Sequence, residues 1–138
     1  MKKIILFLFI VTSLFSFNAI DIQIKILSKI AHEVVKKDVV KIYTDKRDFY
    51  KKKLSSTDIK FVSSIDKADI VFVSNRYELL KCSHKPYILT TSYQLYKLNP
   101  DVLGVFFWQK GRPNIIIRKK VSKEKRLSFS SDFQKFLE

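Results

Sequence analysis

The chain has 138 residues, of which 46% are hydrophobic and 14% aromatic, so it can bury a core and is not an intrinsically disordered protein. Two glycines and three prolines argue against a β-sandwich or barrel with many tight turns. Lys and Arg outnumber Asp and Glu by 27 to 13, a formal net charge of +14, but only five are arginines, the side chain best suited to reading bases, so the charge favours solubility over nucleic-acid binding.

The first 19 residues have the pattern of a secretory signal peptide. Lys2 and Lys3 precede an uncharged apolar run from Ile4 to Phe17, which is shorter than the roughly 20 residues of a membrane-spanning helix. Small residues suit cleavage near Ser16 or Ala19, and no cysteine stands there to mark a lipoprotein. We expect residues 1–19 to be removed on export, the alternative being an uncleaved anchor. The mature chain, residues 20–138, would form one domain with a charge of about +12, since 14 − 2 = 12.

Hydrophobic spacing along residues 20–138 predicts alternating helices and strands. Apolar residues from Ile22 to Val35 recur at helical spacing. Short β-branched runs predict strands at Val39–Thr44, Ile59–Val62, Asp69–Val73, Pro86–Thr91, Leu103–Gln109 and Asn114–Arg118. Helices are expected over residues 46–54, from a Ser74-Asn75 cap to Leu80, from a Ser92 cap to just before Asn99, over Ser122–Arg126 and over Ser131–Leu137.

This alternation predicts an α/β fold of three layers, with a mostly parallel sheet that ends in an antiparallel hairpin. The run Lys110-Gly111-Arg112-Pro113 is the expected hairpin turn. Cys82 is the single cysteine, so an internal disulfide is excluded, and we expect this thiol to be buried; pairing with another chain is the alternative.

The catalytic inventory favours a protein that is not an enzyme. His32 and His84 have no partner at metal-ligand spacing, no G-x-S-x-G elbow surrounds a serine, and no glycine-rich phosphate loop exists. We therefore expect no catalytic residue, no metal and no cofactor.

Two groups of residues are candidates for binding. Polar residues at the carboxyl ends of the predicted strands form the first group, a candidate ligand or anion site: Thr44, Ser74, Asn75, Thr91 and Ser92. The alternative is that they only cap helices. Aromatic and cationic residues of the hairpin form the second group, a candidate surface for a protein partner: Trp108, Lys110, Arg112 and Arg118. Core packing is the alternative for most of the hairpin aromatics.

Five segments of the chain carry a combined pattern of strands, turns and closing hydrophobic residues: Ala68–Ser74, Pro86–Ser92, Val105–Phe107, Gly111–Arg118 and Leu127–Leu137. Together they resemble the YfiR-like family of periplasmic proteins. The most specific match is Ser130-Ser131 followed by spaced hydrophobic residues, which is similar to the family's closing L-x-I-S-S-x-L-L-x-L pattern. The chain departs from the family at Ile116 and Arg118, where a Glu and an Asn are usual, and at Lys36-Lys37-Asp38, in place of an F-x-x-W-P exit.

The resemblance implies a small, exported, non-catalytic α/β domain. Its relatives bind the periplasmic sensor domain of an inner-membrane diguanylate cyclase and hold it inactive, which couples envelope conditions to cyclic-di-GMP signalling. The function expected here is accordingly a periplasmic regulatory protein, peripheral to the membrane, that docks on and inhibits such a signalling protein. A periplasmic receptor for a small ligand or anion is the alternative, electrostatic attachment to DNA or an anionic envelope polymer is a third hypothesis, and a homodimer stays open.

Overall fold

Six strands form a single sheet in the computed structural model, which describes residues 20–46 and 58–138. The strands are β1 (Val40–Thr44), β2 (Ile59–Phe61), β3 (Ile70–Val73), β4 (Ile88–Thr90), β5 (Gly104–Gln109) and β6 (Arg112–Ile117). They lie in the order β2-β1-β3-β4-β5-β6, with β1 to β5 parallel and β6 antiparallel to β5. The predicted α/β fold, a mostly parallel sheet ending in an antiparallel hairpin, is confirmed.

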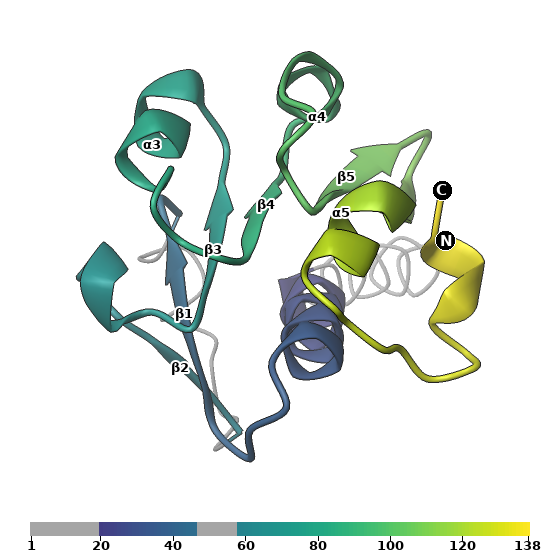
Figure 1. Ribbon diagram of the computed structural model, residues 1–138, viewed down its shortest axis with the longest axis horizontal. Coiled ribbons are helices and arrows are strands. Elements are labelled where there is room, and N and C mark those ends of the chain that lie inside the picture. The colour runs from purple at the N-terminus through teal and green to yellow at the C-terminus, as the bar shows by residue number, and fades with distance from the viewer. Residues whose placement is uncertain (1–19, 47–57) are drawn as a thin grey trace, which may run out of the picture.

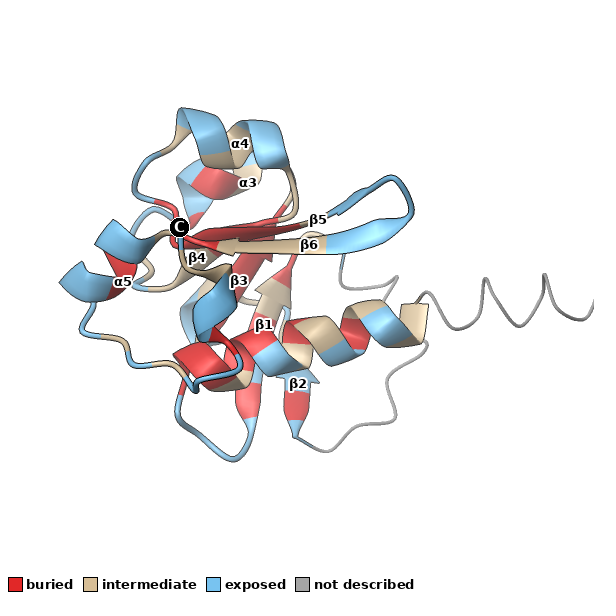
Figure 2. Ribbon diagram, turned by 90° about the vertical axis from the view of Figure 1, so that its right-hand side faces the viewer, coloured by how far each residue is buried: buried red, intermediate tan, exposed pale blue. Residues whose placement is uncertain are grey.

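Helices cover both faces of this sheet (Figures 1 and 2). The N-terminal helix (residues 20–34) lies on one face, where the segment after α5 (Lys119–Glu124) runs past its C-terminal end. On the other face lie α3 (Arg76–Lys81) and α4 (Tyr93–Leu98). Two short 3-10 turns, η1 (Ile65–Lys67) and η2 (Gln134–Phe136), complete the described elements. The layers follow from the sequence, because parallel strands joined by crossovers carry helices on both faces.

The strands divide their side chains between two hydrophobic clusters. Ile42 and Phe72 point into the larger cluster, which includes the N-terminal helix and residues near the C-terminus. Val71 and Val73 point into the smaller cluster, with residues of α3 and the loop before β5. All four residues of β3 are buried because the strand is covered on both faces.

The N-terminal helix follows the predicted periodicity with one exception. Leu27, Ile30 and Val34 lie inward and are at most 2% exposed. Ile22 was expected on the same face but is 42% exposed, since the buried stripe runs through Ile24 instead. Among the described residues, no helix has the length and apolar character needed to cross a bilayer.

The hairpin turn is tighter than predicted. Arg112 and Pro113 belong to β6, where they pair with Gln109 and Trp108, so only Lys110 and Gly111 form the turn. Both have positive φ, 52° and 74°, as a two-residue type I′ turn requires. Pro113 is tolerated because β6 is an edge strand.

The C-terminal segment is less helical than predicted. The helix expected over Ser122–Arg126 begins earlier, at Lys119, and the one expected over Ser131–Leu137 contracts to η2. Leu137 is extended and pairs with Ile117 in an isolated parallel bridge, so the backbone leaves the helical region before that residue. Phe133, 1% exposed, packs into the core.

Two predictions lie outside the described residues. One is the signal peptide of residues 1–19. The other is the helix over residues 46–54, of which only Lys46 is described, in a turn.

Candidate functional site

The carboxyl ends of β1 and β3 meet at the point where the strand order reverses, the usual place of a ligand in an open α/β sheet. Asp45 occupies this point. One of its carboxylate oxygens, Oδ2, accepts hydrogen bonds from the Ser74 backbone amide (2.9 Å), the Ser74 hydroxyl (2.5 Å) and the Asn75 side-chain Nδ2 (3.2 Å). Two of the predicted ligand-binding residues, Ser74 and Asn75, are therefore bound to a carboxylate of the chain itself. A fixed negative charge here disfavours an anion.

The predicted ligand residues also form hydrogen bonds with backbone groups of the chain. Ser92 Oγ accepts from the Leu95 amide (3.3 Å), and Asn75 Oδ1 accepts from the Glu78 amide (2.9 Å), which caps α4 and α3. Thr44 Oγ1 accepts from the Lys46 amide (3.2 Å) and is nearly buried. Thr91 is half-buried and donates its backbone N–H to Val73. These bonds favour the capping alternative.

Beneath this edge, Glu78 adds a second acidic group. The Tyr43 hydroxyl donates to Glu78 Oε2 at 2.8 Å; burial and this carboxylate raise the pKa of Tyr43 to about 12. Cys82 is fully buried, as expected, and burial together with the charges of Glu78 and Asp45 raises the pKa of its thiol to about 11. The thiol is thus protonated at neutral pH and is a weak nucleophile.

A serine, a histidine and an aspartate come together on the N-terminal helix and at the start of β2, which the sequence analysis missed. Ser28 Oγ lies 3.4 Å from His32 Nδ1 and donates to Asp58 Oδ2 at 3.3 Å. His32 Nδ1 also lies 2.8 Å from the Ser28 carbonyl oxygen, to which a nitrogen can only donate. With Nδ1 carrying a proton, His32 cannot accept the proton of Ser28 there, so the group lacks the geometry of a nucleophile–base pair.

The second histidine is part of a surface pair. His84 Nε2 lies 3.1 Å from Asp66 Oδ1, with both side chains more than half exposed. In the described part of the chain, no three His, Cys, Asp or Glu side chains come close enough to hold a metal ion.

The β5–β6 hairpin extends beyond the hydrophobic core (Figure 2). Burial along β5 falls from complete at Gly104 to exposed at Trp108 and Gln109. Trp108 is 38% exposed, with its ring 6.5 Å from that of the buried Phe106. Phe107 points to the other face and packs against Tyr93 of α4 at 5.0 Å. The core alternative therefore holds for Phe106 and in part for Phe107, whereas Trp108 remains accessible.

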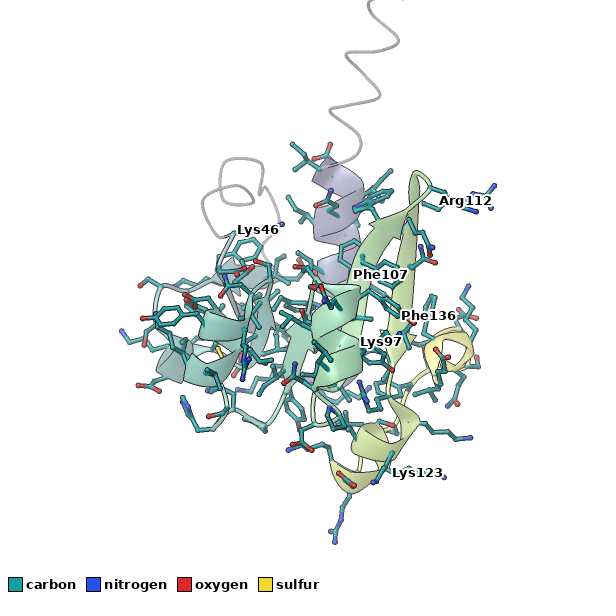
Figure 3. The ribbon with its side chains drawn as sticks, turned by 90° about the horizontal axis from the view of Figure 1, so that it is seen from above. Lys46, Lys97, Phe107, Arg112, Lys123 and Phe136 are labelled. Carbon is teal, nitrogen blue, oxygen red and sulfur yellow. The ribbon has the colours of Figure 1, made fainter. Side chains whose placement is uncertain are left out.

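The cationic side chains at the hairpin tip form no ion pair with the described part of the chain. Arg112 points away from the body of the molecule at the outer end of the hairpin (Figure 3). Lys110, Arg112, Gln109 and Asn114 border a hollow of about 420 Å³. No carboxylate within residues 20–46 and 58–138 forms an ion pair with Lys110 or Arg112. We call Trp108, Lys110 and Arg112 the hairpin tip.

Arg118, the fourth residue of the predicted partner surface, lies at the opposite end of β6. Its guanidinium donates to the carbonyl oxygens of Tyr96 (2.6 Å) and Val102 (3.2 Å) and stacks over the Tyr96 ring at 4.1 Å. These contacts fasten α4 to the base of the hairpin. Arg118 is thus separated from the hairpin tip, and its guanidinium stabilises the fold.

The sequence analysis did not predict that Asp45 would bind Ser74 and Asn75 at the carboxyl ends of β1 and β3. The signal was present in the sequence, because Asp45 directly follows Thr44, which the sequence analysis counts among the candidate ligand residues at the strand ends. In comparisons with known proteins, no family model matches the chain and no curated protein matches its sequence. The resemblance to YfiR-like proteins stays a prediction.

Proposed function

We propose that this chain is an exported, non-catalytic regulatory protein that docks through its hairpin tip on an acidic partner. The partner is the periplasmic sensor domain of an inner-membrane signalling protein, such as a diguanylate cyclase, which the bound protein holds inactive. The export and the partner class rest on the leader-like residues 1–19 and on the resemblance to YfiR-like proteins.

One observation supports the docking surface above the others. The hairpin tip carries an exposed tryptophan and two cations beyond the core, and no described carboxylate neutralises them. Tryptophan and arginine supply much of the binding energy in protein interfaces. The positive charge also accelerates encounter with an acidic surface, an effect that salt screens.

Inhibition follows from differential affinity. A partner with active and inactive arrangements is held inactive when the bound protein prefers the inactive one. A short turn suits this role, since a two-residue turn at Lys110-Gly111 limits the backbone freedom that would be lost on binding.

The test is a quantitative affinity capture from envelope extract with three forms of residues 20–138. These are the natural chain, a Lys110→Glu/Arg112→Glu variant, and a Lys120→Glu/Lys123→Glu control that makes the same charge change on exposed positions of α5. A membrane signalling protein should be enriched by the natural chain and the control, and lost with the hairpin variant. Equal recovery by the natural chain and the hairpin variant would reject the proposed surface.

A further inference from the structure

A groove of about 540 Å³ lies at the amino ends of the strands, the edge opposite to the hairpin tip. It is bordered by the end of the N-terminal helix, the residues that lead into β3 and β4, and the segment after α5. Its volume is within the range of small-ligand sites. The two segments that form its walls are tied together, because Ser130 donates its amide (3.1 Å) and its hydroxyl to the Glu33 carboxylate.

The groove combines an apolar wall with positive charge. Val34, Val35, Tyr87 and Leu127 contribute to the wall. Four cations line the same space, namely Lys36, Lys37, Lys125 and Arg126.

Among the described residues that line the groove, Asp69 is the one carboxylate, and it already has hydrogen-bond partners. Asp69 binds Lys37 Nζ and the Lys41 amide, each at 2.9 Å. Burial opposes ionisation of Asp69, but these two donors outweigh it and hold its pKa below the usual value. Lys36 lies near Glu33 (3.8 Å), whereas Lys125 and Arg126 form no ion pair with any carboxylate in the described ranges. Lys125 and Arg126 therefore give the groove positive charge that no described carboxylate neutralises.

Arg126 stands at a position where the backbone prefers glycine. The residue follows α5 with φ 56°. The backbone amides of Arg126 and Leu127 donate to the carbonyl oxygens of Lys123 and Ser122, respectively, which are the two hydrogen bonds of a Schellman motif. Glycine is the usual residue at this left-handed position, because a Cβ is strained there. The chain places a cationic side chain at the rim of the groove in spite of that strain.

From these observations we propose that the groove binds a small amphiphilic anion, a carboxylate or phosphate head on a short apolar body. The head pairs with Arg126 and Lys125, and the apolar body lies against Tyr87 and Leu127. This binding site is independent of the hairpin tip and adds a ligand to the proposed regulatory function.

Arg126→Gly gives a sharp test, since it removes the charge while relieving the strained backbone, so the fold should be at least as stable. The probes are hexyl phosphate and hexanoate, with inorganic phosphate and 1-hexanol as the separated halves, titrated by calorimetry into the purified protein. At least one amphiphile should bind, at least tenfold more tightly than either half, and Arg126→Gly should weaken it at least fivefold. The matched control Arg112→Gly, which removes the same charge at the hairpin tip, should leave the affinity unchanged.

The opposite results would overturn the proposal. These are no binding of either amphiphile at millimolar concentration, equal affinity for a separated half, or equal losses in Arg126→Gly and Arg112→Gly. Partner capture tests the hairpin tip through Lys110 and Arg112, and ligand titration tests the groove through Arg126. The docking proposal and the groove proposal can therefore fail independently of one another.

Discussion

The two ends of the β5–β6 hairpin carry similar residues in opposite circumstances. At the base, Arg118 gives its guanidinium to two carbonyl oxygens and an aromatic ring. At the tip, Arg112 has neither a carboxylate partner among the described residues nor a neighbouring core (Figure 3). The same side chain can thus hold the fold or remain available to a partner, and only its position along the strand decides which.

The largest effect is expected at Gly104, where β5 begins at the hairpin base. A Cβ on this residue would lie 2.5 Å from the Ile116 carbonyl oxygen and 2.8 Å from Ile117 Cδ1. Gly104→Ala should therefore destabilise the protein by about 3 kcal/mol. Urea unfolding measures this loss, and a loss below about 1 kcal/mol would show that the base is not closely packed.

The two arginines give the most direct comparison. Arg118→Ala removes two charge-assisted hydrogen bonds and the stacking on Tyr96, and should lower the free energy of unfolding by about 2 kcal/mol. Arg112→Ala should change it by less than about 0.5 kcal/mol. Equal losses in urea unfolding would contradict the distinction between base and tip.

Low pH should destabilise the segment of residues 130–137, which packs beside the base of the β5–β6 hairpin, and should leave the hairpin tip unchanged. Burial tends to raise the pKa of Glu33, but the hydrogen bonds from Ser130 and the charges of Lys29 and Lys36 outweigh it and leave the pKa lowered. A lowered folded-state pKa gives stability that is present above the unfolded-state pKa and lost as the pH falls through the folded value.

Protection of amides 130–137 against hydrogen exchange should therefore decline from about pH 5 downward, after correction for the intrinsic rate. Glu33→Gln should already show the loss at pH 7. A pH-independent protection, or a variant that behaves like the natural chain, would show that the Glu33 carboxylate does not hold this segment.

A small gain in stability is expected in the turn. Lys110→Asn places a residue that tolerates positive φ at 52° and should stabilise the hairpin by about 0.5 kcal/mol. The same substitution removes a tip cation and should weaken partner capture. The unfolding temperature should thus rise while the captured amount of partner falls, and a variant with unchanged capture would remove Lys110 from the docking surface.

The sequence predicted the fold better than the sites. Local patterns identify elements such as β3, whose unbroken apolar run indicates a strand covered on both faces. The contraction of Ser131–Leu137 to η2 depends on the bridge between Leu137 and Ile117, a contact that no local pattern reports.

The sequence identified candidate binding residues by their chemical type, but it could not show which of them are exposed and which are bound to other parts of the chain. Arg112 and Arg118 look alike in sequence, and the capture of Ser74 by Asp45 joins residues 29 positions apart. The groove was missed for the same reason, because its cations come from two segments about 90 residues apart, at Lys36 and Arg126.

Site-specific photo-crosslinking tests the docking claim most directly. A photoreactive residue replaces Gln109, beside the hairpin tip, or Gln94, an exposed position on α4, in the full chain expressed in its own host. Position 109 should give an adduct with an inner-membrane signalling protein, reduced by Arg112→Glu, and position 94 should give none. Adducts of equal yield from both positions, or none from position 109, would contradict docking through the hairpin tip.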